Sequence, residues 1–171
     1  MAKLDIVLYP DEPLTQKATP YDRIDSEVAD LANDMLETML EYDGVGLAGP
    51  QVGVDKRIFV LCEPESEPMV FVNPEVTLIE GRLEGEEGCL SLPHIFATVP
   101  RAGRIRVRAS DQAGKKLDFE PEGFLARIIQ HEYDHLDGIV FPDRLDILSR
   151  EDTLAAWEEM RRNLMDAAGL E

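Results

Sequence analysis

The segment Gln130-His131-Glu132-Tyr133-Asp134-His135 contains two of the chain's three histidines, four positions apart. Residues four apart lie on one face of an α-helix, so both imidazoles can reach one metal ion. Glu132 is turned about 100° round the helix from His131, given 3.6 residues per turn. It can therefore reach a water on the metal, which is the division of roles typical of H-E-x-x-H helices.

The helix that carries this segment is predicted to run from about Glu122 to Leu136. Pro121 stands near its start and Gly138 just past its end, as is usual for helices. The apolar stripe of this helix continues into the histidines, through Phe124, Ile128, His131 and His135. An unpaired imidazole on a buried face is costly, so the stripe also favours a bound metal over two surface histidines.

In the rest of the sequence, the residue patterns predict antiparallel strands between two further helices. Amphipathic spacing predicts helices over about Asp25–Tyr42 and Ser149–Ala168. Apolar runs and apolar–polar alternation predict strands at Arg57–Cys62, Met69–Asn73, Val76–Leu83, Arg104–Ser110 and Lys116–Phe119. This order, with an N-terminal helix, several antiparallel strands, the motif helix and a C-terminal helix, indicates an α+β fold. No linker interrupts the pattern, so we expect one domain over residues 1–171.

A catalytic metal site usually has three protein ligands and one open position for water, so a third ligand is needed. Cys89 is the leading candidate, because Gly88 lets the backbone come close to another element. Cys62 ends an apolar strand and is better explained as a core residue. His94 and Glu87 remain alternatives as the third ligand.

The glycine-rich segment Gly44–Gly53 matches neither the dinucleotide-binding nor the phosphate-binding glycine motif. Its simplest interpretation is a helix C-cap followed by a flexible loop. The functional interpretation is a loop whose backbone approaches a ligand closely. In that case the side-chain amide of Gln51 can donate a hydrogen bond to a developing oxyanion.

The composition restricts the partners and the compartment. The chain has 35 acidic and 17 basic residues, a net charge of −18, which disfavours direct nucleic-acid binding. No apolar run approaches the roughly 18 residues that a membrane span needs. The N-terminal residues lack the apolar core of a signal peptide, so we expect a cytoplasmic protein with both cysteines reduced.

Three segments together resemble the motifs of the peptide deformylase family. Gly44–Gln51 resembles its G-x-G-L-A-A-x-Q loop, Glu87–Ser91 its E-G-C-L-S strand, and Gln130–His135 its Q-H-E-x-D-H helix. The resemblance covers about residues 4–145, and it implies an α+β fold in which antiparallel strands pack around the central helix that carries the H-E-x-x-H motif. Gly49 replaces the family's second alanine, which we expect to loosen the pocket wall, and Phe96 stands where some members carry an arginine that contacts substrate.

The resemblance implies hydrolysis of the N-formyl group from the N-terminal formylmethionine of nascent polypeptides, with release of formate. It implies one divalent transition-metal ion. Fe²⁺ is the ion expected in the cell, and Zn²⁺, Ni²⁺ or Co²⁺ can also occupy the site. The implied site residues are the metal ligands Cys89, His131 and His135, the general base Glu132, and the oxyanion donors Gln51 and the Leu90 N–H.

The family's pocket implies that the substrate methionine lies against Val45, Gly46, Phe124 and Ile128, although core packing would explain each of them singly. Arg127 is expected at the pocket rim with its charge in solvent. Asp134 either orients a ligand imidazole or forms a surface salt bridge. The implied partners are the formylmethionyl peptide and, because nascent chains emerge there, the ribosome.

Two other classes of protein share the helix motif. A metalloprotease usually takes its third ligand from a downstream Glu or His, and no histidine follows His135. A non-catalytic zinc module needs four protein ligands, so His94 or Cys62 would have to join. Cleavage of an internal peptide bond would indicate a metalloprotease. A metal site without bound water would indicate a non-catalytic zinc module.

Overall fold

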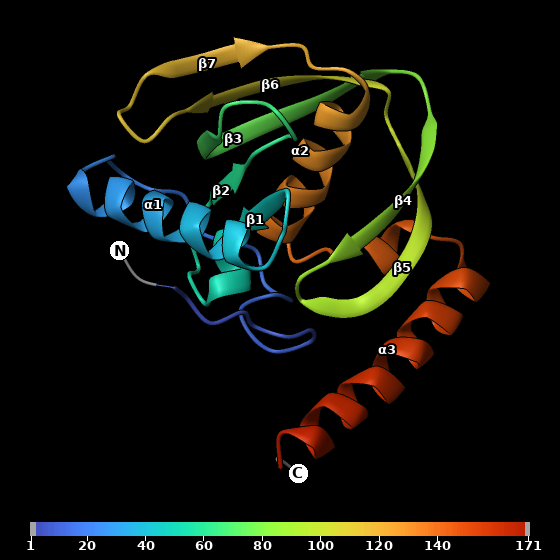
Figure 1. Ribbon diagram of the computed structural model, residues 1–171. Coiled ribbons are helices and arrows are strands. Elements are labelled where there is room, and N and C mark those ends of the chain that lie inside the picture. Colours follow the sequence, from blue (N-terminus) through green and yellow to red (C-terminus); the bar gives the residue numbers. More distant parts are fainter. Residues whose placement is uncertain (1–2, 170–171) are drawn as a thin grey trace.

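The computed structural model describes residues 3–169 and confirms an α+β fold (Figure 1). The strands are β1 (Gly46–Ala48), β2 (Ile58–Leu61), β3 (Met69–Glu80), β4 (Leu83–Cys89), β5 (Leu92–Arg101), β6 (Arg104–Ser110) and β7 (Lys116–Phe119). The helices are α1 (Ser26–Glu41), α2 (Gly123–Leu136) and α3 (Ile147–Ala167), with short 3-10 turns η1 (Gly49–Val52) and η2 (Phe141–Arg144). The predicted single domain over 1–171 includes residues 1–2 and 170–171, which lie outside the described residues.

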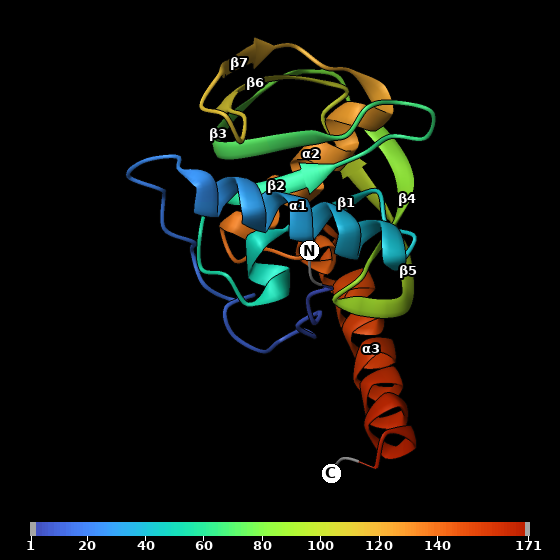
Figure 2. The same ribbon diagram turned by 60° about the vertical axis from the view of Figure 1, so that its left-hand side comes forward.

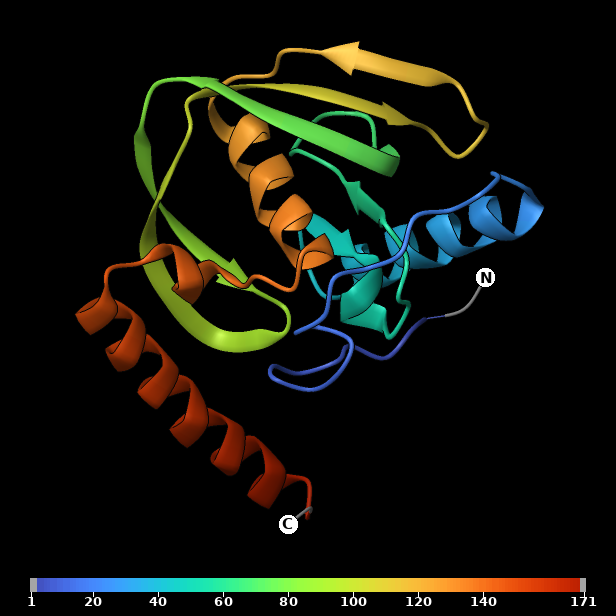
Figure 3. The ribbon, with the colours of Figure 1, turned by 180° about the vertical axis from the view of Figure 1, so that it is seen from behind.

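The strands form two antiparallel sheets that enclose α2 (Figure 3). The five-stranded sheet has the order β1-β2-β3-β6-β7, and β4 pairs with β5 in a separate ribbon. All four residues of β2 are buried, as expected for a strand covered on both faces. Ile58 and Val60 pack with the apolar stripe of α1, whereas Phe59 and Leu61 pack with α2.

Helix α2 lies at the centre of the fold, and ten of its fourteen residues are buried. Ala126 and Ile129 face the large sheet, so the opposite side of the helix turns toward the β4–β5 ribbon. Gly138, with φ 75°, follows the helix end, where a Cβ atom would come 2.9 Å from the Thr15 backbone. The chain therefore needs a glycine at this point to leave the helix and pass Thr15.

The two outer helices were predicted correctly to within a few residues, but the strands were predicted only in part. Met69–Glu80 is one strand, and the predicted interruption is an irregularity between Val72 and Glu75. The β4–β5 ribbon was predicted only at its first residue, and the Gly46–Ala48 strand was interpreted as loop. These segments are rich in glycine and glutamate, so tertiary pairing rather than local propensity makes them strands.

Helix α3 extends away from the rest of the molecule and contacts it along part of its length (Figure 2). Trp157 is its buried residue, and the indole N–H donates to the Tyr9 carbonyl at 2.9 Å. Among the described residues, no helix has the length and apolar character that crossing a membrane requires.

Candidate active site

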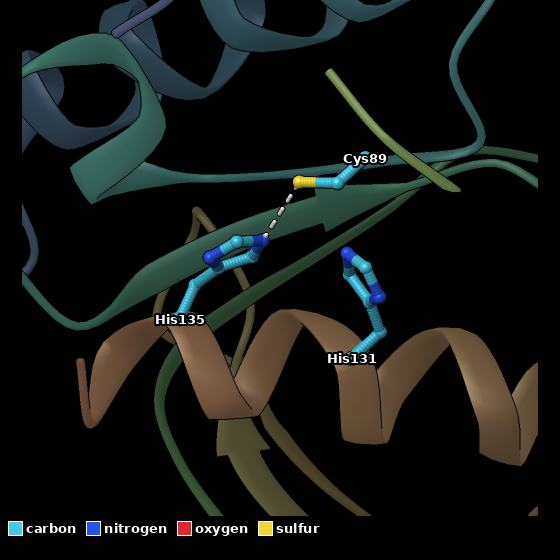
Figure 4. Close-up of side chains that lie close together, drawn as sticks. All are labelled: Cys89, His131 and His135. Atoms are coloured by element: carbon cyan, nitrogen blue, oxygen red, sulfur yellow. Dashed lines mark hydrogen bonds between the residues drawn. The ribbon is translucent and has the colours of Figure 1, made fainter. Parts of the chain in front are cut away.

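Three candidate metal ligands from two elements meet on the buried face of α2. Cys89 ends β4, and His131 and His135 lie one turn apart on α2 (Figure 4). Their candidate ligand atoms all lie within 4.8 Å of one another, and the Cys89 Sγ lies 3.4 Å from the His135 Nε2. Within residues 3–169 this is the one group of three such side chains.

This donor set fits a catalytic metal ion. One sulfur and two imidazole nitrogens leave a position open for water, as catalytic sites do and structural sites do not. The alternative ligands lie outside the group: the Cys62 thiol donates to the Ser66 carbonyl at 3.3 Å, and His94 is exposed on β5. A closed site of four protein ligands would need one of them, so the described residues do not support a structural zinc module.

The two histidines have different electrostatic surroundings. Burial, with the charges of His131 and Arg101, holds the pKa of His135 well below its ordinary value. Burial opposes a charge on His131 too, but Glu132, Cys89 and Glu87 raise its pKa. Negative groups that favour a proton on His131 also favour a divalent cation beside it, whereas the neutral His135 offers a free lone pair.

Glu132 lies beside the three ligand side chains but is not one of them. Its Oε2 is 3.9 Å from the His131 Nε2, and its Oε1 is buried without a hydrogen-bond partner among the described residues. Burial raises the pKa of Glu132 to about 7. A carboxyl group with such a pKa can both accept and return a proton near neutral pH.

Gln51 is held with its amide directed at the same site. Its carbonyl accepts a hydrogen bond from the Ala48 N–H at 2.9 Å, which fixes the amide orientation. The Nε2 then lies 3.4 Å from the Cys89 Sγ and 3.2 Å from the Ser91 Oγ. Leu90 directly follows Cys89 and lines the same cavity. The candidate oxyanion donors therefore lie next to the metal ligands.

A cavity of about 630 Å³ opens onto these groups. The four candidate pocket residues Val45, Gly46, Phe124 and Ile128 all line it, together with Cys89, His131 and Glu132. A Cβ atom on Gly46 would lie 2.5 Å from the Glu132 Oε2. A glycine is therefore required where β1 passes this carboxylate. The rim is apolar in part, because Phe96 and Phe124 are 62% and 51% exposed.

Gly49, which was expected to loosen the pocket wall, does not itself line the cavity. It is a buried residue of η1. A Cβ atom there would lie 2.9 Å from the Lys56 carbonyl oxygen and 3.1 Å from the Val54 carbonyl oxygen. The glycine therefore allows the chain after η1 to pack closely, and its effect on the pocket wall stays a prediction.

Glu87 is the residue that orients a ligand imidazole, a role that the sequence had suggested for Asp134. The Glu87 Oε1 lies 2.8 Å from the His131 Nδ1, so Glu87 supports a ligand instead of being one. Asp134 instead accepts hydrogen bonds from Arg101 and Arg144. Of the two alternatives for Asp134, the salt bridge is the one observed: its ion pair with Arg101 is buried, and its pair with Arg144 reaches a half-exposed arginine.

Arg127 lines the cavity as expected, but the expectation that its charge lies in solvent is wrong. Its side chain is only 10% exposed, and its guanidinium points away from solvent to Glu87 at 2.6 Å. Burial alone would raise the pKa of Glu87, but hydrogen bonds from Arg101 and His131 hold it well below its usual range. Glu87 therefore stays ionised among these partners.

The sequence provided little sign of this buried charge network. The partners are far apart in the sequence, because Glu87 is 14 positions from Arg101 and 40 positions from Arg127. No local spacing therefore brings them together. The one available signal is the position of Glu87 two residues before Cys89, on a strand whose alternate side chains share a face.

Comparison with known proteins points to one family. A family model described as polypeptide deformylase matches residues 3–151. A peptide deformylase from Chromohalobacter salexigens is 45% identical over 170 residues, which cover 98% of this chain and 100% of that protein. A relative from Alkalilimnicola ehrlichii is 47% identical over 88% of this chain and 86% of its own length.

Solved structures agree over almost the whole chain. The peptide deformylase from Thermus thermophilus superposes with a TM-score of 0.89 at 46% identity, covering 96% of this chain and 99% of that one. The peptide deformylase from Ehrlichia chaffeensis in complex with actinonin superposes with a TM-score of 0.89 at 35% identity. The match covers 95% of this chain and 99% of that one. The chain joins Cys89 of β4 to two histidines of an H-E-x-x-H helix in one candidate metal site, and it belongs to the polypeptide deformylase family.

Proposed function

We propose that Cys89, His131 and His135 hold the metal ion with which this chain removes the formyl group from the N-terminal methionine of nascent peptides. The activity is that of the family, and the residue roles are our assignment. The observation that carries the assignment is the convergence of the three ligand atoms within 4.8 Å next to a buried carboxylate with a free oxygen.

A divalent metal ion at these ligands supplies Lewis acidity, which lowers the pKa of water and polarises a carbonyl group. Glu132 accepts the proton from the water that attacks the formyl carbon, and it later passes this proton to the leaving amine. The products are formate and a peptide with a free N-terminus.

The formyl oxygen gains negative charge as the water attacks. The Gln51 Nε2 and the Leu90 N–H are the donors assigned to this charge, because both lie beside Cys89 and the cavity. The Ala48 N–H orients the Gln51 amide before substrate arrives. Donors that are already oriented stabilise the transition state without a cost of reorganisation at that moment.

The cavity walls are assigned to the methionine side chain. Val45, Gly46, Phe124 and Ile128 form one continuous lining with the ligands, so an apolar side chain bound there brings the formyl group to Glu132. The residues that follow the methionine lie across the cavity rim in this proposal, and the substrate is a nascent chain that emerges from the ribosome in the cytoplasm. The whole chain, 1–171, is proposed to act as one domain.

For the metal we propose Fe²⁺ in the cell, with Zn²⁺, Ni²⁺ or Co²⁺ able to replace it. A thiolate with two imidazoles favours a late first-row metal over Mg²⁺ or Ca²⁺. Elemental analysis of protein purified without oxygen tests this identity, and a preparation that contains zinc alone contradicts it.

Formate release from N-formyl-Met-Ala-Ser tests the assignment of Glu132. Wild type and Glu132→Gln are prepared without oxygen and loaded with the same metal. We expect the variant to keep its metal and to lose about 10²–10⁴ in kcat, the usual contribution of a general acid–base group. Glu122→Gln is the matched control, because this exposed carboxylate stands at the other end of α2, and it should retain wild-type turnover.

Two outcomes would contradict the proposal. Turnover of Glu132→Gln near the wild-type rate would remove Glu132 from the mechanism. A metal-loaded wild type that releases no formate would leave the ligand set intact and remove the deformylation reaction. Cleavage of an internal bond in an unformylated peptide would then indicate a metalloprotease.

A further inference from the structure

Arg127 takes no part in the roles assigned above, yet it makes some of the shortest contacts near the site. Its Nη1 lies 2.6 Å from the Glu87 Oε2 and 2.8 Å from the Val99 carbonyl oxygen. Its Nη2 donates to the Leu83 carbonyl at 2.6 Å. One side chain on α2 therefore holds a carboxylate and both strands of the β4–β5 ribbon.

Glu87 connects this arginine to a metal ligand. Arg127 and His131 lie one turn apart on α2 and contact the two different oxygens of the Glu87 carboxylate. Arg101 holds the same carboxylate from β5, at 2.9 Å to each oxygen. The carboxylate cannot turn without breaking one of these contacts, so its Oε1 stays directed at the His131 Nδ1.

The two ligand histidines differ in this support. The His135 Nδ1 is buried without a hydrogen-bond partner among residues 3–169, whereas the His131 Nδ1 has Glu87. A hydrogen bond to the second ring nitrogen fixes the tautomer and the ring orientation of a metal-ligating imidazole. The orientation of His131 is therefore the one that the protein controls through a charged partner.

The backbone of β4 is shaped to receive the Arg127 guanidinium. A Cβ atom on Gly85 would lie 3.0 Å from its Cζ and Nε atoms, closer than an unstrained contact allows. A side chain at position 85 would therefore force the guanidinium to shift from its present position against its three acceptors. The buried side chains around this contact are also balanced in charge. Two carboxylates, Glu87 and Asp134, pair with two guanidinium groups, Arg101 and Arg127, and each side chain is no more than 10% exposed.

We infer that Arg127 is a positioning residue, which fixes Glu87 so that Glu87 orients the metal ligand His131. The inference rests on the metal-site assignment of the proposed function. Without Arg127, Glu87 keeps both contacts with Arg101 but loses the shorter of the two contacts to its Oε2, and one buried negative charge is left in excess. Loss of such supporting partners typically weakens metal affinity or activity by about 10–100-fold.

The test measures metal release directly. Wild type, Arg127→Met and Arg127→Lys are loaded with Co²⁺, and its transfer to a chelator is followed through the cobalt–thiolate absorption of Cys89. We expect Arg127→Met to release Co²⁺ about 10–100 times faster than wild type. Arg127→Lys keeps the charge, but its single nitrogen cannot replace the two guanidinium nitrogens that reach Glu87, Val99 and Leu83, so its release rate should fall between those of wild type and Arg127→Met.

Arg57→Met is the matched control. Arg57 is also buried, at 11% side-chain exposure. It donates to the Ala18 and Leu136 carbonyls and pairs with Asp137 at 3.0 Å. Its carboxylate partner contacts no ligand imidazole. We therefore expect Arg57→Met to lower the melting temperature while Co²⁺ is released at the wild-type rate.

Gly85→Val gives a second test if Arg127→Met does not fold. It preserves every charge and forces the Arg127 guanidinium to shift, so it should also release Co²⁺ faster than wild type. The inference is overturned if Arg127→Met or Gly85→Val lowers the melting temperature but releases Co²⁺ at the wild-type rate. Because metal release needs no substrate, this result is independent of whether the wild type releases formate.

Discussion

Glu132 and Gly46 face each other where β1 passes α2, and their contact controls the position of the proposed general base. A Cβ atom at position 46 would lie 2.5 Å from the Glu132 Oε2, 2.9 Å from its Cδ and 3.0 Å from its Cγ. Such contacts cannot be relieved by moving one terminal atom, so the whole carboxylate would have to shift.

We expect Gly46→Ala to lower kcat without removing the metal. The new methyl group displaces the Glu132 carboxylate, and a shift of about 1 Å in a reacting group costs about 10²-fold in rate. Formate release and metal content, measured on the same preparation, check this expectation. Gly103→Ala is the control, because its Cβ would make an ordinary contact at 3.5 Å with Leu83. An unchanged kcat in Gly46→Ala would mean that Glu132 tolerates displacement or has no role.

At this scale the sequence could predict side chains whose partners are close in the chain. The spacing of His131 and His135 is a local property of a helix, so it indicated the ligands directly. The environment of Arg127 is not local, because its carboxylate partner lies 40 positions earlier. An arginine on a helix is most often exposed, and this general expectation failed where a strand supplied a buried counter-charge.

At the scale of elements, the β4–β5 ribbon shows why part of the fold could not be predicted. β4 contains two glycines and three glutamates in seven residues, a composition with low strand propensity. It is a strand because β5 pairs with it along its whole length and because Arg127 binds the carbonyls of Leu83 and Val99. By contrast, β2 is an apolar run buried on both faces, and its sequence indicated it correctly.

Helix α3 depends on one side chain for much of its packing. Trp157 is 2% exposed and packs with Leu92, Ile95 and Val99 of β5. The helix has no other residue that is fully buried. Because β5 follows directly after the Cys89 turn, this contact also supports the strand next to the metal ligands.

We expect Trp157→Ala to lower the free energy of unfolding by about 3–5 kcal/mol, the usual effect of removing a large buried side chain. Chemical denaturation followed by circular dichroism measures it. Leu148→Ala on the same helix is the control, because Leu148 is 73% exposed and surface substitutions change stability by about 0.5 kcal/mol or less. Equal stability of the two variants would show that α3 does not dock through Trp157.

At the scale of the whole molecule, the three motifs identified the family although they are far apart in the sequence. The fold explains this, because β1 with η1, the end of β4 and α2 meet at one cavity. The net charge of −18 was also available from the sequence, but its relation to the site was not. In the structure Asp43 and Glu86 line the cavity, and the one arginine there, Arg127, is paired with Glu87.

This distribution predicts a preference among substrates by charge. No exposed Lys or Arg among the described residues lines the cavity. A substrate with an acidic residue after the formylmethionine is therefore repelled by the acidic cavity rim and by the net negative charge of the protein. We expect kcat/KM to be higher for formyl-Met-Lys peptides than for formyl-Met-Glu peptides. Fields of this kind change association rates by about 10-fold or more.

Added salt should reduce this preference, because the Debye length falls from about 10 Å at 0.1 M to about 3 Å at 1 M. The measurement is the ratio of the two kcat/KM values across that range, in wild type and in Glu86→Gln, where a smaller ratio is expected even at low salt. A preference that persists unchanged at high salt would indicate a direct contact with the lysine side chain. A ratio near one at every salt concentration would show that the negative rim does not act on the substrate.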